Sequence, residues 1–218
     1  MANPDAYFLR NEVSNSTLTE LKQLLYPQIM YGDKEKAFKF GTLIDAIITE
    51  PDRVDFYKLT VDDVKYLEED FNLALEMRKS LKMEARKDRF LDNVLKHFDT
   101  QTVSIKQNQI FDYYGFEFML NTRCKWDWHS SLMNFGGDLK SSAASSQKEF
   151  EEAIDFFDWD RSRAWYMDIV GSSQDFIYAI SKKNCKVFKY FIKRGDKTYE
   201  KGKEKYLDLA FKYWQLII

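Results

Sequence analysis

Three triplets of the form acidic–x–Lys occur in the sequence, and only one lies where its acid and its lysine act together. The triplets at residues 20–22 and 63–65 fall in segments with a helical pattern, where side chains two positions apart do not face each other. The third, at residues 138–140, ends a run that is typical of a β-strand. Side chains two positions apart on a strand share one face, so Asp138 and Lys140 project together.

A second acid, Asp127, ends the preceding strand-like run. A tight return between the two strands brings Asp127 beside Asp138, where two carboxylates repel unless a cation lies between them. Oxygen-rich sites of this kind suit Mg²⁺ or Mn²⁺, which polarise a phosphodiester and activate a water, while the ammonium of Lys140 orients that water or neutralises developing charge. The residues match phosphodiester hydrolysis. The alternative is an exposed hairpin end with two solvated acids and a lysine.

Two further features bear on this group. Gly136 and Gly137 directly precede the triplet, and glycines in a strand permit close approach of a backbone or a ligand. Asp45 stands in a run, residues 41–48, that is otherwise apolar nearly all round. A carboxylate there is costly unless it is paired or bound to a metal. Asp45 is therefore either a metal ligand or part of a partly exposed helix face or a structural pair with Lys or Arg, and the two interpretations carry equal weight.

The spacing of apolar residues changes along the chain between the period of a helix and that of a strand. Capping boxes at residues 17–20 and 146–149 mark two helix starts. Apolar spacing predicts helices at residues 14–25, 35–49, 61–98 with a break near 79–84, 150–157, 160–170 and 198–216. Strands are predicted at residues 102–111, 116–126 and 132–140 as an antiparallel meander, and at 176–180 and 185–193. This order indicates an α/β or α+β domain with one sheet flanked by helices.

Composition narrows the classes of function. The formal net charge is −2, so the chain lacks the positive excess of a protein that holds DNA by electrostatics alone, although an enzyme with a locally basic groove stays possible. Two cysteines and two histidines, widely spread, cannot by themselves build a closed zinc site or an iron–sulfur cluster. The N-terminus lacks a signal-peptide pattern, and no apolar run approaches the ~20 residues of a membrane span. We expect a cytoplasmic protein with no membrane partner.

Five segments carry a resemblance to a known family: residues 13–18, 40–51, 124–127, 137–142 and 160–166. With them the chain resembles the PD-(D/E)xK superfamily, in particular the phage-type, RecB-like exonucleases of the exodeoxyribonuclease VIII (RecE-type) family and, more distantly, the lambda-type exonuclease. The resemblance covers nearly the whole chain. It implies a single nuclease-like domain over residues 1–218, with a restriction-endonuclease-like core whose central mixed sheet is flanked by helices. Residues 1–98 would be its mainly helical part, and residues 99–218 its catalytic sheet with flanking helices.

The resemblance also implies roles for residues. Asp127, Asp138 and Lys140 would be catalytic; Mg²⁺ or Mn²⁺ would be held by Asp45, Asp127, Asp138 and the backbone carbonyl of Leu139; and substrate would be bound by Arg161, Ser162, Arg163 and Tyr166. Three positions depart from the family pattern. Asp45 stands where the family usually has a metal-binding His, Gln107 stands near a position often held by Glu, and Ser162 replaces a helix Gln.

Two functions follow from the resemblance. The first is a Mg²⁺-dependent DNA exonuclease that degrades linear duplex DNA in phage recombination, with a single-strand annealing protein as partner and homo-oligomers compatible with the sequence. The second is a catalytically weakened DNA-binding or assembly subunit, which the three departures favour. Phosphate contacts require a basic surface near the acids. The candidates are Lys140, Arg161, Arg163 and one or more of Lys34, Lys36 and Lys39.

Overall fold

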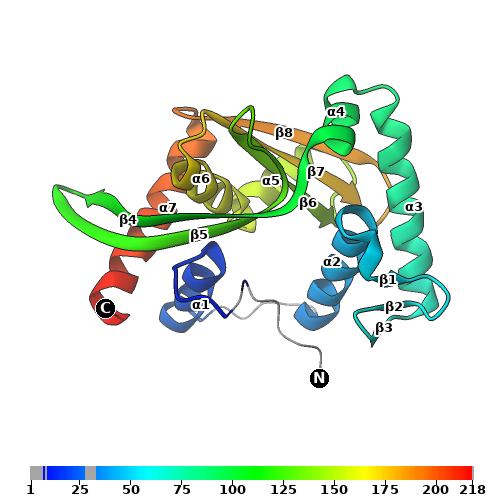
Figure 1. Cartoon of the computed structure of the whole chain (residues 1–218), viewed down its shortest axis with the longest axis horizontal. Coiled ribbons are helices and arrows are strands. Elements are labelled where there is room, and N and C mark those ends of the chain that lie inside the picture. Colours follow the sequence, from blue (N-terminus) through cyan, green and yellow to red (C-terminus); the bar gives the residue numbers. More distant parts are fainter. Residues whose placement is uncertain (1–6, 8, 28–32, 218) are drawn as a thin grey trace.

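A five-stranded mixed sheet forms the centre of the fold, with helices on both of its faces (Figure 1). The computed structural model describes Tyr7, residues 9–27 and residues 33–217. The strand order is β4-β5-β6-β7-β8, and only β6 and β7 run parallel. The strands are β4 (Asp99–Tyr113), β5 (Phe116–Ser130), β6 (Phe135–Ser142), β7 (Gln174–Ser181) and β8 (Val187–Lys193). The predicted mixed sheet flanked by helices and the antiparallel meander of its first three strands are confirmed.

The two strands that carry the acids end later in the sequence than the pattern predicts, and β6 also begins later, at Phe135 rather than at residue 132. β5 continues through Asp127 to Ser130, because Trp128 is buried and pairs with Gly137 of β6. β6 likewise continues past Lys140 to Ser142, alongside β7. Asp127 and the triplet therefore lie inside their strands and not at strand ends. The pattern failed here because polar residues interrupt the alternation at the place where the strands carry their buried acids.

Three helices cover one face of the sheet: α2 (Lys34–Thr49), α3 (Glu68–Ala85) and α4 (Arg89–His97). Their buried side chains form one core cluster with Trp128, Leu139, Phe176 and Tyr178 of the sheet. The prediction of one helical stretch over residues 61–98 is wrong at two places. The turn η1 (Pro51–Arg53) and a small antiparallel sheet of β1 (Val54–Asp55), β2 (Thr60–Val61) and β3 (Val64–Lys65) precede α3.

The break in that stretch falls at residues 86–88 rather than near 79–84. Asp88 causes it, because its carboxylate accepts hydrogen bonds from the backbone N–H groups of Phe90 and Leu91. These are donors that the first turn of a helix leaves without partners, so a side-chain acceptor favours a helix start. A new helix, α4, therefore begins directly after Asp88.

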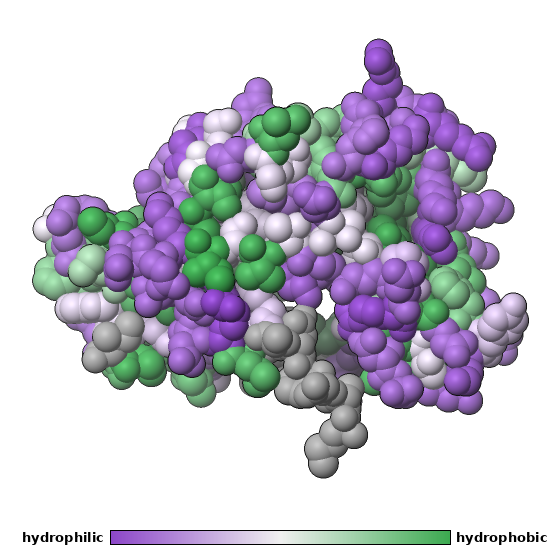
Figure 2. Space-filling model, in the orientation of Figure 1, coloured by the Kyte–Doolittle hydropathy of each residue, from purple (hydrophilic) through white to green (hydrophobic). Residues whose placement is uncertain are grey.

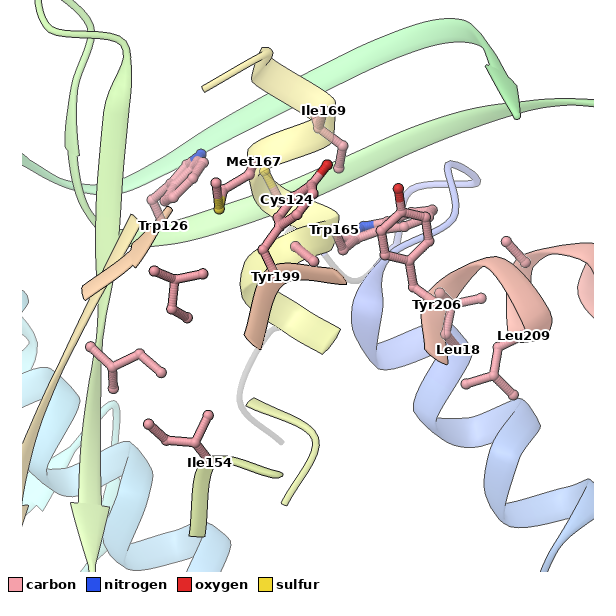
Figure 3. Packing of buried hydrophobic residues seen from close by; sticks show 14 of the residues in the cluster. Leu18, Cys124, Trp126, Ile154, Trp165, Met167, Ile169, Tyr199, Tyr206 and Leu209 are labelled. Carbon is pink, nitrogen blue, oxygen red and sulfur yellow. The ribbon is translucent and has the colours of Figure 1, made fainter. Parts of the chain in front are cut away.

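Four helices cover the other face: α1 (Asn15–Leu25), α5 (Gln147–Phe156), α6 (Trp159–Val170) and α7 (Lys197–Ile217). Figure 3 shows their core, in which Trp165 of α6 packs edge-on against Tyr206 of α7 with ring centroids 5.4 Å apart. The capping box of α1 joins Ser14 and Thr17, one turn earlier than predicted. Among the described residues, no helix has both the length and the apolar character that crossing a membrane requires.

Helices α6 and α7 approach closely because Gly202 of α7 has no side chain. A Cβ atom at Gly202 would lie 2.2 Å from the backbone oxygen of Asp160. That oxygen belongs to the helix backbone, which cannot move aside as a flexible side chain would. The position of α6, and of every side chain that α6 presents to the sheet, therefore depends on this glycine.

Gly202→Ala should destabilise the fold by about 1–3 kcal/mol, because it overpacks a tight backbone contact. Gly41→Ala is the matched control: Gly41 also lies inside a helix, and a Cβ there meets nothing within 4 Å. The control should stabilise the chain by about 0.5–1 kcal/mol through its better helix propensity. Urea unfolding of both variants measures the two effects, and equal stabilities would contradict the packing argument.

Candidate active site

The pairing of β5 with β6 ends at the candidate site. Residue pairs join Ser130 to Phe135, His129 to Gly136 and Trp128 to Gly137. The next opposed pair in this register would be Asp127 and Asp138. Instead of continuing the ladder, the Oδ2 atom of Asp127 accepts a hydrogen bond from the buried backbone N–H of Leu139, at 2.8 Å. We call this place the β5–β6 fork, defined by Asp127, Asp138 and Leu139.

Asp138 and Lys140 share one face of β6, as the strand periodicity predicts. The Nζ atom of Lys140 lies 2.5 Å from Oδ2 of Asp138. Asp138 is only 6% exposed, so the exposed hairpin end with solvated acids is wrong for this residue. Leu139 points to the other face, into the core under α2, α3 and α4. The alternation of β6 therefore separates a polar face from an apolar one at this triplet.

Gly136 and Gly137 make room for close neighbours within the protein, which are aromatic rings at both positions and, at Gly136, also the backbone oxygen of Trp128. A Cβ at Gly136 would lie 2.5 Å from the ring of Trp126, and a Cβ at Gly137 would lie 2.2 Å from the ring of Phe176. These rings belong to the core clusters on opposite faces of the sheet. The two glycines therefore let the sheet be clamped by aromatic side chains immediately before the triplet.

Helix α2 brings Asp45 to the fork, because α2 packs against both β5 and β6. Burial raises the pKa of the Asp45 carboxyl strongly, and the charges of Asp127 and Asp138 raise it further, while Lys140 opposes them. These influences act only at short range through the protein. Asp45 therefore shares its electrostatic surroundings with Asp127, Asp138 and Lys140, which come from two other elements.

The two strand acids respond to this crowding in opposite directions. Burial, and then the charge of Asp138, raises the pKa of Asp127 to about 6. Burial also favours the neutral form of Asp138, but Arg163 and then Lys140 outweigh it, so the pKa of Asp138 is lowered. Negative charge is therefore concentrated on Asp138, where Arg163 and Lys140 balance it, whereas burial and the neighbouring acids disfavour the charged form of Asp127. A site of this kind gains stability from an added cation.

The donors of the site are of the chemical type that binds a hard cation. Three carboxylates and a backbone carbonyl are oxygen ligands, which Mg²⁺ and Mn²⁺ prefer. Their arrangement is less complete, since no three His, Cys, Asp or Glu side chains in the described part of the chain are placed to hold an ion together. The ammonium of Lys140 now neutralises Asp138. Holding a metal therefore requires side-chain rearrangement at the fork.

Of the predicted substrate-binding residues of α6, Arg161 and Ser162 point away from the β5–β6 fork, whereas Arg163 and Tyr166 contact each other. Arg161 faces α1, where its guanidinium donates to Asn15 Oδ1 at 3.0 Å and to Thr19 Oγ1 at 2.5 Å. The hydroxyl of Ser162 donates to the backbone oxygen of Trp159. The structure does not bring either side chain to the β5–β6 fork, because successive residues of a helix point in different directions. Tyr166 lies under the guanidinium of Arg163, 4.0 Å from ring centroid to carbon.

Sequence reasoning missed two residues of the site, Gln101 and Asp175. Gln101 lies opposite Asp127 on β4, with its Nε2 atom 3.5 Å from Asp127 Oδ1 and 3.0 Å from Thr49 Oγ1. Its backbone is left-handed, with φ of 53°, which is uncommon for a residue other than glycine. Gln107, the expected counterpart, is exposed beside the β-bulge of β4. No local feature of the sequence distinguishes Gln101 from Gln107. Asp175 could have been noticed, because this acid directly precedes the apolar run of a predicted strand.

Basic side chains do lie on the helix that carries Asp45. Lys36 and Lys39 are exposed on α2, and the Nζ of Lys39 lies 5.1 Å from the ring centroid of Tyr66. Lys182, at the end of β7, places its Nζ 5.6 Å from the ring centroid of Phe40. The side chain of Lys34 lies outside the described residues. Figure 2 shows hydrophilic residues gathered over α2 and the small sheet beside it.

The comparisons with known proteins agree at the level of the fold. No family model matches the sequence, and no curated protein matches it. A solved candidate exonuclease from Eubacterium rectale is similar over 88% of this chain and 70% of its own, with 13% identity and a TM-score of 0.51. A phage-related exonuclease from Haemophilus somnus 129PT is 15% identical over 94% of this chain and 95% of its own, with a TM-score of 0.40. The first likeness shows a shared fold.

Variants of Asp127 test whether its carboxylate supports the fork. The pKa of Asp127 is about 6 in the folded chain and exceeds the ordinary value of 3.8. The free energy of unfolding therefore falls as the pH rises from ~4 to ~6, and the full loss is present above pH ~6. At pH 8, Asp127→Asn should be at least as stable as the wild type. Asp127→Ala should be less stable than Asp127→Asn by about 1–3 kcal/mol, because it leaves the buried N–H of Leu139 without an acceptor. Equal unfolding midpoints for the two variants would remove this role.

Proposed function

We propose that this chain is a metal-dependent nuclease that hydrolyses phosphodiester bonds of DNA, acting as an exonuclease on linear duplexes. The observation that carries the proposal is the convergence of Asp127, Asp138 and Lys140 at the β5–β6 fork, with Asp45 beside them. A fold shared with a candidate exonuclease supports it. The fold alone does not define a function, so the proposal depends on the chemistry of the site.

Asp45, Asp127, Asp138 and the backbone carbonyl of Leu139 would hold Mg²⁺ or Mn²⁺. When bound there, the ion would polarise the phosphate and activate a water. Burial and then the neighbouring acids raise the pKa values of Asp45 and Asp127, and binding of an ion would offset both effects. The clustering of the acids therefore favours a cation as the ligand, because an uncharged ligand would not offset their negative charge.

Lys140 would act as a fixed positive charge and not as a base. Burial opposes its charge, but Asp138 and Asp127 outweigh burial, so the pKa of the Lys140 ammonium is raised. It stays protonated at neutral pH and donates hydrogen bonds only. An ammonium in this place stabilises negative charge that develops on the attacked phosphate or orients the water through its lone pairs.

The phosphate backbone needs positive charge outside the acidic fork. Lys39 and Lys182 are each held against an aromatic ring beside α2, which limits the freedom that they would lose on binding a phosphate. They supply a local basic surface that the net charge of −2 does not reveal. A role in phage recombination, a single-strand annealing partner, homo-oligomers and a cytoplasmic location are finer parts of the same proposal.

A second candidate function is a DNA-binding or assembly subunit with weakened catalysis. The observation that favours it is the ion pair between Lys140 and Asp138, together with the lack of three metal-ligating side chains in position within the described residues. If this pair is too stable to open, the fork holds no metal. DNA binding would then remain without cleavage.

Asp138→Asn should abolish metal-supported cleavage, because it removes the acid with the lowered pKa. Lys140→Ala should leave Mn²⁺ bound but lower turnover by about 10²–10³-fold, since the ammonium acts on charge that develops in the transition state. The measurement is release of nucleotides from linear duplex DNA with Mg²⁺ or Mn²⁺, with closed circular DNA as the substrate that an exonuclease leaves intact.

A matched control comes from the other strand-borne triplet of the structure. Asp63→Asn and Lys65→Ala change the same residue types, but both side chains are exposed on and beside β3. They should leave turnover unchanged within about twofold, as surface substitutions usually do. If the wild type cuts neither duplex nor single-stranded DNA and Lys140→Ala behaves identically, the subunit function takes the place of the nuclease.

Asp45→Ala should weaken Mn²⁺ binding by about tenfold, which is the lower range for a lost interaction around a metal. Folding should be retained, because the change removes a half-buried acid with a strongly raised pKa. Isothermal titration with Mn²⁺ measures the affinity directly. An affinity equal to that of the wild type would leave Asp45 with a structural role only.

A further inference from the structure

A buried arginine, Arg163, lies between two buried acids. Its NH2 atom is 3.4 Å from Oδ1 of Asp138, and its NH1 atom is 3.7 Å from Oδ2 of Asp175. Its Nε donates to the hydroxyl of Ser162 at 3.3 Å, and its guanidinium covers the ring of Tyr166. Every side of the guanidinium therefore meets protein. Lys140, Asp138, Arg163 and Asp175 form a row in which basic and acidic side chains alternate, which we call the charge row.

Arg163 cannot bind substrate from this position. Its side chain is 1% exposed, and the ring of Tyr166 lies directly against it. A phosphate would have to displace Asp138 or Tyr166 to reach the guanidinium. The predicted substrate-binding role of Arg163 would require these neighbours to move, whereas its contact with Asp138 is already formed.

Asp175 contacts Arg163 from the neighbouring strand β7. It is the second residue of β7 and is completely buried, and neither of its oxygens has a well-formed hydrogen bond to a described group. Burial raises the pKa of this carboxyl, although Arg163 opposes the shift. A buried acid without hydrogen bonds lowers stability. Its place beside Arg163, where the guanidinium offsets that cost, points to a function of the pair.

We propose that Arg163, held by Asp175, is a positioning residue that sets the direction of the Asp138 carboxylate at the β5–β6 fork. This proposal rests on the proposed function, because it concerns the acid that would hold the metal. The guanidinium is planar and presents donors in a fixed fork. It can therefore contact Asp138 with one nitrogen and Asp175 with another, which a lysine cannot do in the same place.

The geometry of the elements supports a positioning role. Asp138 lies on β6, Arg163 on α6 and Asp175 on β7, so the charge row ties the carboxylate to two elements besides its own strand. Strands β6 and β7 are parallel neighbours, with Asp138 paired to Ile177. Asp175 therefore points to the same face as Asp138, two residues earlier on β7. The guanidinium bridges the diagonal between them.

Mn²⁺ titration of the full chain tests the proposal without depending on cleavage. Arg163→Gln should weaken Mn²⁺ binding by about tenfold, a typical loss when an outer-shell partner of a metal ligand is removed. DNA binding in the presence of EDTA should stay unchanged within twofold. Arg163→Lys should not restore the affinity, because one ammonium cannot contact both acids.

Arg161→Gln is the matched control, since Arg161 is a buried arginine on the same helix that contacts α1 instead of Asp138. It should lower the unfolding temperature, as Arg163→Gln does, yet keep the wild-type affinity for Mn²⁺. Asp175→Asn provides a milder variant if Arg163→Gln does not fold. It keeps the shape of the side chain and should weaken Mn²⁺ binding by a smaller factor, about threefold, because the amide holds the guanidinium less firmly.

The outcomes separate this proposal from the proposed function. Unchanged Mn²⁺ affinity in both Arg163→Gln and Asp175→Asn overturns the positioning role alone. Weaker DNA binding with unchanged Mn²⁺ affinity would also overturn it and return Arg163 to the substrate. If the wild type binds Mn²⁺ but cuts no DNA, the nuclease proposal fails while the positioning role is still decided by the variants. A wild type that binds no Mn²⁺ overturns both.

Discussion

The hydrogen bond from the backbone N–H of Leu139 to the carboxylate of Asp127 is the interaction on which the site depends. β5 and β6 stop pairing just before it, and an unsatisfied N–H in this buried position would be costly. The side chain of Asp127 takes the place of the missing strand partner. This places one carboxylate of the site and keeps the fork open beside Asp138. The carboxylate of Asp127 therefore both supports the strands and belongs to the proposed metal site.

Aromatic packing holds the fork in place from both faces. Trp126 fills the space above Gly136, and Phe176 fills the space above Gly137, so the strand directly before the triplet is clamped. Trp126 and Trp128 belong to different core clusters although they are two residues apart. The regular alternation of β5 is thus broken at Asp127. A rigid apolar frame surrounds the few polar groups, and their positions are set by packing as much as by their own charges.

The charged and acidic groups of the site depend on one another. Asp138 lies between Lys140 and Arg163, and Arg163 lies between Asp138 and Asp175. In a poorly polarisable interior each charge is tolerated only because an opposite charge is near. The acids Asp45 and Asp127 have weaker compensation, and their raised pKa values reflect it. The acids at the fork therefore have less positive charge near them than they need, and this is the physical basis for expecting a cation there.

The sequence by itself determined the type and order of most elements and the shared face of Asp138 and Lys140, because helix and strand periodicities are local properties. It also singled out Asp45, since an acid in an apolar helix is unusual wherever the helix packs. Only the tertiary structure decided which residues surround the triplet. Gln101, Arg163 and Asp175 come from β4, α6 and β7, and their approach to the fork depends on long-range packing, such as the contact at Gly202 that places α6. Arg161 and Arg163 look equivalent in sequence, yet the rotation of their helix sends one to α1 and the other to Asp138.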